Sequence, residues 1–172
     1  MIMKKATLIL AVVLFTTFNL CAQSKSNISI EQKTEKKCQQ KGEKIFIKYA
    51  VECLEIMEVE AQKTAAQGVA TISFIPGEET ESWISRMKVV GKLTNEKHNF
   101  LAIAGSKAAE MATTYVASGS KTREPLTGEF GFKGGVIKKL KCGYLVASFS
   151  GAPSEIDAEI SKAGAEFLAS KM

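Results

Sequence analysis

Histidine is the scarcest chemically versatile residue in this sequence, because the 172 residues include only one, His98. A single histidine excludes His-rich zinc and di-iron sites, and it makes any Ser-His-Asp triad depend on that one residue. The sequence also contains no nucleophile elbow, Walker loop or dinucleotide-binding fingerprint. The glycine-rich run 131–135 has no helix directly after it, which makes it weak evidence for phosphate binding.

The chain also lacks a large excess of charge of one sign. The chain has 23 basic and 18 acidic residues, a net charge of +5. Lys4 and Lys5 lie in an N-terminal leader, and without them the excess is about +3. The remaining basic residues are spread along the chain, with no arginine cluster and no interleaved aromatic residues. We therefore expect no nucleic-acid partner.

Long apolar runs are absent except near the start of the chain. Residues 1–5 are short and basic, and residues 6–20 are almost wholly apolar, which is typical of a secretory signal peptide. The run is too short for a stable transmembrane span. We predict a signal peptide over residues 1–22, cleavage after Ala22, and a periplasmic or secreted protein. The alternative is a lipoprotein anchored at Cys21, but the three residues before this cysteine are not small.

The remaining chain alternates between helical and extended patterns. Residues 23–33 are polar and predicted to be a flexible lead-in, and residues 34–172 form one predicted domain. Within it, the patterns predict helices over 34–67, 96–116 and from 154 onward, and strands over 69–75, 82–90 and 144–149. Strands joined by short turns imply an antiparallel sheet, so the fold class is α+β, with helices flanking that sheet.

Residues 134–164 form the most strongly patterned segment. Gly134-Gly135 is followed by a polar stretch, the apolar strand 144–149 and the turn 150–153. Ser154 is a candidate helix N-cap, and Asp157 lies in the first turn, where the helix dipole favours acids. We expect a hairpin whose second strand turns directly into an amphipathic helix.

This order of motifs resembles the GlcG/HbpS-like family, whose members are often called haem-binding or haem-degrading proteins. The resemblance rests on a glycine pair, a spacer, an apolar strand, Ser-Gly-Ala, an aspartate and Ala-Gly, all within 134–164. Upstream, Arg86-Met87 matches the family's RM after a strand, and Lys107-Ala108 matches KA in the next helix. It covers roughly the last four-fifths of the chain.

The resemblance implies a profilin-like α-β-α arrangement and haem as the ligand. It also implies self-assembly into a homo-oligomer, and in some relatives iron-dependent haem breakdown or redox sensing. His98 is the candidate axial ligand of the haem iron, because imidazole is a common haem ligand. The alternative is a solvent-facing histidine in the first turn of a helix. Met87, Met111 and Tyr115 are the other candidate ligands.

Three basic residues are candidates for binding haem propionates or another carboxylate: Arg86, Lys107 and Lys133. The alternative for each is a solvated surface charge or a local ion pair. Arg86 is the strongest of the three because it occupies the matched RM position.

Some positions depart from the family pattern. Leu145 and Ser148 stand where relatives often have glycine, and residues 88–90 replace the usual Asp-Gly. If those glycines allow a ligand to approach, the pocket here is narrowed or lost. One alternative function follows from this, a scaffold that kept the fold without the ligand. The resemblance implies the other, an accessory protein for small organic acid metabolism, because some relatives are associated with glycolate or diol metabolism. The sequence leaves open whether the chain is an enzyme.

Three cysteines follow the leader, Cys38, Cys53 and Cys142. Cys38 and Cys53 lie about 22 Å apart along one straight helix, whereas disulfide-bonded Cα atoms lie about 4.4–6.8 Å apart. We expect all three cysteines to be reduced, and the alternative is one disulfide and one free thiol.

Overall fold

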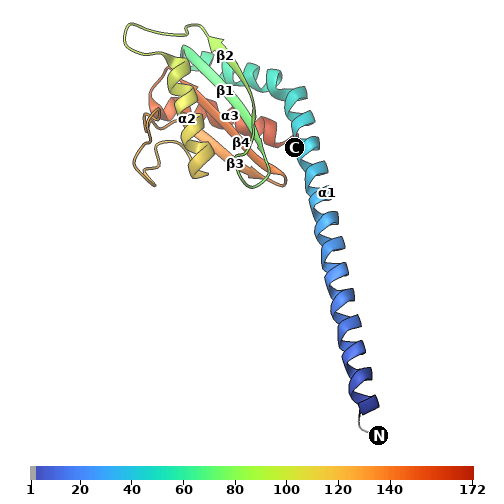
Figure 1. Ribbon diagram of the computed structural model, residues 1–172. Helices are drawn as coiled ribbons and strands as arrows, with labels where there is room; N and C mark the ends of the chain where they lie inside the picture. Colours follow the sequence, from blue (N-terminus) through green and yellow to red (C-terminus); the bar gives the residue numbers. More distant parts are fainter. Residues whose placement is uncertain (1–2) are drawn as a thin grey trace. The chain divides into compact units, whose positions relative to one another are not determined.

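The structure is a computed structural model that describes the backbone of residues 3–172 and the side chains of residues 32–172. The chain divides into two compact units, residues 1–37 and residues 38–172. The elements, labelled in Figure 1, are α1 (Met3–Lys63), β1 (Gly68–Pro76), β2 (Ile84–Val90), α2 (Phe100–Thr114), β3 (Gly135–Leu140), β4 (Gly143–Ser150) and α3 (Ser154–Ala169).

Helix α1 enters the second unit with an apolar stripe. Phe46, Ala50, Cys53, Met57 and Ala61 recur at helical spacing, and all are fully or almost fully buried. The helix passes without a break through residues 23–33, where the sequence predicted a flexible lead-in. Cleavage after Ala22 and lipidation of Cys21 concern side chains outside the described residues, so both stay predictions.

Among the residues that the structure describes, no helix combines the length and the apolar character needed to cross a membrane.

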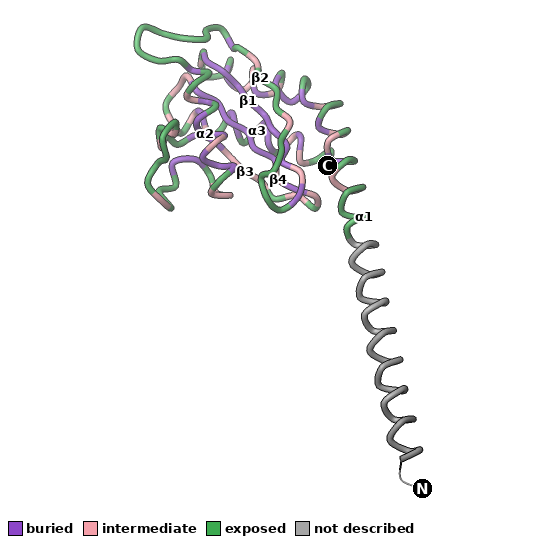
Figure 2. Tube along the Cα trace, in the orientation of Figure 1, coloured by how far each residue is buried: buried purple, intermediate pink, exposed green. Residues whose placement is uncertain are grey.

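The four strands form one antiparallel sheet in the order β2-β1-β4-β3. The central strands β1 and β4 are almost wholly buried, as Figure 2 shows. Ala70, Ile72 and Phe74 of β1 face the stripe of α1 and helix α3, in the main core. Alternate β1 residues, among them Val69 and Ile75, face α2 on the opposite side of the sheet. The predicted α+β class is therefore confirmed.

The start of α2 and the N-cap of α3 differ from prediction, whereas α3 begins at Ser154 as predicted. Helix α2 begins at Phe100 instead of residue 96, because the Asn99 side chain accepts a hydrogen bond from the backbone of Ala102 and caps it. His98 thus lies before the helix and not in its first turn. The prediction that Ser154 caps α3 is wrong, since Pro153 holds the N-cap position and no side-chain bond is made there.

The prediction of three reduced cysteines is wrong for two of them. Cys38 on α1 and Cys142 in the β3–β4 turn form a disulfide, with their Cα atoms 5.6 Å apart. The turn lies beside the segment of α1 that contains Cys38, a proximity that only the folded packing creates. Cys53 is free, as predicted, and its buried thiol donates to the carbonyl oxygen of Gly164. Burial raises the pKa of Cys53 to about 12.

The long connection between α2 and β3 is held together by one ion pair. Arg123 donates to both carboxylate oxygens of Glu129, at 2.6 and 2.8 Å. The same carboxylate accepts the backbone N–H of Leu126, and Arg123 also donates to the Thr113 hydroxyl on α2. The Arg123 guanidinium, helped by the Leu126 N–H, lowers the pKa of Glu129 from 4.5 to about 2.

We expect this connection to loosen in acid. Because the pKa of Glu129 is lower in the folded state than in the unfolded state, its contribution to stability is complete above about pH 4.5. That contribution is lost as the pH falls from there toward 2. Amide hydrogen exchange at Leu126, corrected for the intrinsic rate, should accelerate across this range. In Glu129→Gln the corrected rate should not change with pH, and equal profiles in the two proteins would contradict the prediction.

Candidate functional site

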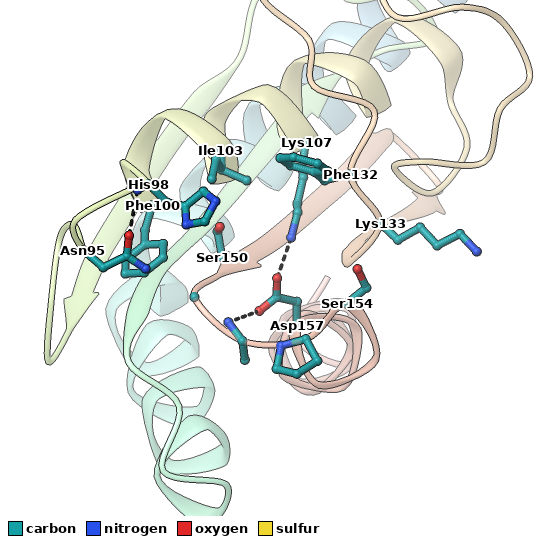
Figure 3. Close-up of a pocket in the computed structure, with 13 residues that line it drawn as sticks. Asn95, His98, Phe100, Ile103, Lys107, Phe132, Lys133, Ser150, Ser154 and Asp157 are labelled. Atoms are coloured by element: carbon teal, nitrogen blue, oxygen red, sulfur yellow. Dashed lines mark hydrogen bonds and ion pairs between the residues drawn. The ribbon is translucent and has the colours of Figure 1, made fainter.

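A cavity of about 290 Å³ opens where α2, the end of β4 and the start of α3 meet. Three of the four predicted site residues line it, namely His98, Lys107 and Lys133. Figure 3 shows them with the other lining residues, which include Asn95, Phe100, Ile103, Phe132, Ser150 and Asp157. The structure therefore gathers into one place residues that lie up to 62 positions apart in the sequence.

Lys107 and Asp157 form a buried ion pair at this cavity. Their side chains are only 2% and 5% exposed, and the ammonium nitrogen lies 2.7 Å from a carboxylate oxygen. Lys107 also donates to the carbonyl oxygen of Phe149, and the second Asp157 oxygen accepts the backbone N–H of Ala152. The pair therefore ties together α2, β4, the turn after it and α3.

Burial is the largest influence on the pKa of each partner. It lowers the pKa of Lys107 and raises that of Asp157, while the attraction between the two charges opposes both shifts. Because the Lys107 ammonium already has two acceptors, it is not a free cation for a ligand carboxylate. A role as a propionate partner would therefore have to compete with this ion pair.

Gly134 is required beside this pair. Its φ of +116° lies in the region that favours glycine, and a Cβ atom there would lie 2.6 Å from the Asp157 Cβ and 2.8 Å from the Lys107 ammonium nitrogen. The Gly134 carbonyl accepts a hydrogen bond from the Ser161 hydroxyl of α3. The first glycine of the predicted pair thus lets the chain pass close to the ion pair.

His98 is positioned by the turn that precedes α2. Its backbone N–H donates to the Asn95 side chain at 2.7 Å, and Asn95 in turn bonds the backbone carbonyl of His98. In Figure 3 the imidazole ring extends from this turn toward the interior of the cavity, near Phe100 and Ile103. The turn therefore fixes the backbone of His98 and leaves its side chain exposed.

Lys133 and Phe132 form another side of the cavity. Lys133 is exposed and has no ion-pair partner among the side chains of residues 32–172. Figure 3 shows its side chain extending away from the Lys107–Asp157 pair. Phe132 is 48% exposed and contributes an apolar surface at the cavity. The site therefore combines an imidazole, aromatic surface and one available ammonium group.

The other candidate residues lie outside this cavity. Arg86 is exposed on β2, paired in register with Ile72, which places it on the face of the sheet opposite to α2. Met87 is exposed on the same strand, Met111 is buried in the core, and the Tyr115 hydroxyl accepts the backbone N–H of Thr80. Of the four candidate iron ligands, only His98 lines the cavity.

Asp157, Asn95 and Phe132 were not identified as site residues from the sequence. Asp157 was noted only as an acid in the first turn of a helix, a position that the helix dipole already explains. Asn95 occurs in a polar loop without a motif. One signal was present for Asp157, since the resemblance includes an aspartate after Ser-Gly-Ala.

The comparisons with known proteins concern the fold. No family model and no curated protein matches the chain. A crystal structure of a double mutant of HbpS from Streptomyces reticuli is similar, with a TM-score of 0.51 and 18% identity, over 70% of this chain and 84% of that chain. A second HbpS crystal structure has a TM-score of 0.49 and 17% identity, over 70% and 87%. The chain has the fold of HbpS, as the sequence motifs predicted.

Proposed function

We propose that this protein binds haem in the cavity between α2, β4 and α3, with His98 as the iron ligand. The observation that carries the proposal is the His98 ring, which extends from a hydrogen-bonded turn into a cavity lined by Phe100 and Phe132. The HbpS fold and the family resemblance of the motifs support the same ligand. From the family resemblance we also expect secretion, and either haem breakdown or the sensing of haem or redox state.

The residues present fit haem in their chemistry. His98 offers a nitrogen ligand, Phe100 and Phe132 offer apolar surface for the porphyrin, and Lys133 offers an ammonium for a propionate. The cavity volume, about 290 Å³, lies at the lower end for ligand pockets. Haem would supply the iron chemistry, and the chain would supply orientation, an axial ligand and a partly dry surface.

A haem titration of the protein that begins at Gln23 tests this proposal. We expect a saturable Soret band in the wild-type protein, and binding weakened at least about 10-fold in His98→Ala, with a shifted band, because the iron loses its protein ligand. Lys133→Met should weaken binding less, since it removes one exposed charge. Lys97→Met is the matched control, because Lys97 is exposed but does not line the cavity.

The outcomes separate the alternatives. An unchanged band in His98→Ala would move the ligand to another group. A weak signal that does not saturate would overturn haem binding and favour the scaffold or the small-acid accessory protein. No further observation at the cavity supports either alternative. Among the described residues, Lys107 and Asp157 are the only buried acid–base pair of the cavity, and they already bond to each other.

We also infer that the protein is exported. The leader pattern predicts secretion, and the Cys38–Cys142 disulfide is a bond that persists mainly in oxidising compartments. The intact mass of protein recovered from outside the cytoplasm tests both points together. A mass that includes the leader would contradict export. A mass that is higher by two hydrogens would show that Cys38 and Cys142 are reduced.

Self-assembly stays an expectation of the resemblance. An exposed apolar surface is available, since Trp83, Met87, Val89 and Leu101 are each about two-fifths exposed. Met87 and Val89 pair in register with Thr71 and Val69, on the side of the sheet that α2 covers only in part.

A further inference from the structure

A second cavity, of about 320 Å³, lies between α2 and the long connection that follows it. It shares no lining residue with the first cavity. Its lining residues are Glu110, Gly119, Lys121, Arg123, Glu124, Pro125, Phe130 and Gly131. Ile103, Lys107 and Glu110 follow one another on α2 at helical spacing, so one stripe of this helix serves both cavities.

Glu110 is the unusual residue of the second cavity. It is only 7% exposed, and one carboxylate oxygen accepts the backbone N–H of Gly119 at 2.8 Å. The other oxygen is buried and has no hydrogen-bond partner in the described part of the chain. A buried acceptor without a donor is costly, by about 1–3 kcal/mol, and more for a charged group. A ligand that donates a hydrogen bond here would remove this penalty.

The neighbouring cations do not donate a hydrogen bond to this Glu110 oxygen. Arg123 uses its guanidinium on Glu129, the Glu124 carbonyl and Thr113. Lys121 has no ion-pair partner among the described side chains, and its ammonium is therefore available to an anionic group. The residues that line the cavity thus include one with a buried, unsatisfied acceptor and one available cation.

The remaining walls are apolar and well fixed. Phe130 and Pro125 supply the apolar surface, and the Phe130 backbone N–H donates to the Ser106 hydroxyl of α2 at 2.7 Å. Gly131 has a φ of +65°, and a Cβ atom there would lie 3.0 Å from Pro125. The connection between α2 and β3 therefore packs closely around the second cavity.

We propose that the second cavity binds a free α-amino acid with an apolar side chain. The ligand ammonium would donate to the unpaired oxygen of Glu110, its carboxylate would pair with Lys121, and its side chain would contact Phe130 and Pro125. The nearby cations would repel a ligand that has an amine but no carboxylate. Glu110 would repel a ligand that has a carboxylate but no amine. Only a molecule with both groups matches both charges of the site.

Calorimetric titration of the purified protein with L-leucine tests the proposal. Isoamylamine and isocaproate, which each lack one of leucine's two charged groups, are the matched ligands. We expect saturable binding of leucine and at least about 10-fold weaker binding of either analogue. Glu110→Gln should weaken leucine binding by a similar factor, because the amide can still accept from Gly119 but presents a donor to the ligand ammonium.

Lys121→Met should also weaken leucine binding by about 10-fold, while Lys97→Met should leave it unchanged. Lys121 is exposed, so this variant remains informative if Glu110→Gln folds poorly. His98→Ala should bind leucine normally, which separates this site from the proposed haem site. No saturable leucine binding at millimolar concentration, or equal binding of leucine and isoamylamine, would overturn the proposal.

Discussion

The Lys107→Met variant should lose about 3–5 kcal/mol of unfolding free energy. The side chains of Lys107 and Asp157 are almost completely buried, and methionine fills a similar space without the charge. The Asp157 carboxylate would then remain buried with only backbone donors, and the carbonyl of Phe149 would lose its lysine donor. Equilibrium denaturation by urea would measure the loss.

The matched control is Lys133→Met, which makes the same substitution at the same cavity on an exposed side chain. Its effect should stay within about 0.5 kcal/mol. The double variant Lys107→Met with Asp157→Leu should be more stable than Lys107→Met alone, because neither charge is then left unpaired. A loss below about 1 kcal/mol in Lys107→Met would show that the pair does not hold these elements together.

The second large effect concerns the disulfide. Replacing Cys38 and Cys142 together by serine should lower the unfolding free energy by about 2–5 kcal/mol. The two cysteines are separated by 104 positions, so the bond strongly restricts the unfolded chain. For a protein of this size the midpoint of thermal unfolding should fall by roughly 4–20 °C.

Reductant provides the control for this experiment. It should destabilise the wild-type protein by about as much as the double substitution does. It should leave the Cys38→Ser/Cys142→Ser variant unchanged, because Cys53 is a buried free thiol. If reductant lowers the midpoint of both proteins equally, the disulfide is not the source of the stability.

Local patterns in the sequence predicted the elements well. The apolar run 144–149 marked β4, and the β-branched run 69–75 marked β1, because buried strands leave short and continuous apolar runs. The helix start was less predictable. Asn99 caps α2 from inside a polar loop that offers several similar residues, so the true start could not be singled out.

Long-range pairings were the part that the sequence did not reveal. Lys107 pairs with Asp157, and Cys38 pairs with Cys142, in each case between elements that meet only once the sheet has formed. The spacing of these residues contains no period that would connect them. For Glu110 the sequence did contain a signal, because it is a charged residue on the apolar side of α2, next to buried Met111. That pattern indicates a buried carboxylate but not the cavity beside it.

The position of the disulfide also constrains the order in which the chain can mature. The covalent ring from Cys38 to Cys142 contains β1, β2, α2 and β3, whereas β4 and α3 lie wholly outside it. An oxidant therefore cannot close the correct ring until the chain is accessible as far as Cys142. Until then Cys53 is the only other thiol of the domain available to Cys38, and early helix formation in α1 keeps those two apart. Rapid folding of α1 would thus protect the chain from a wrong crosslink.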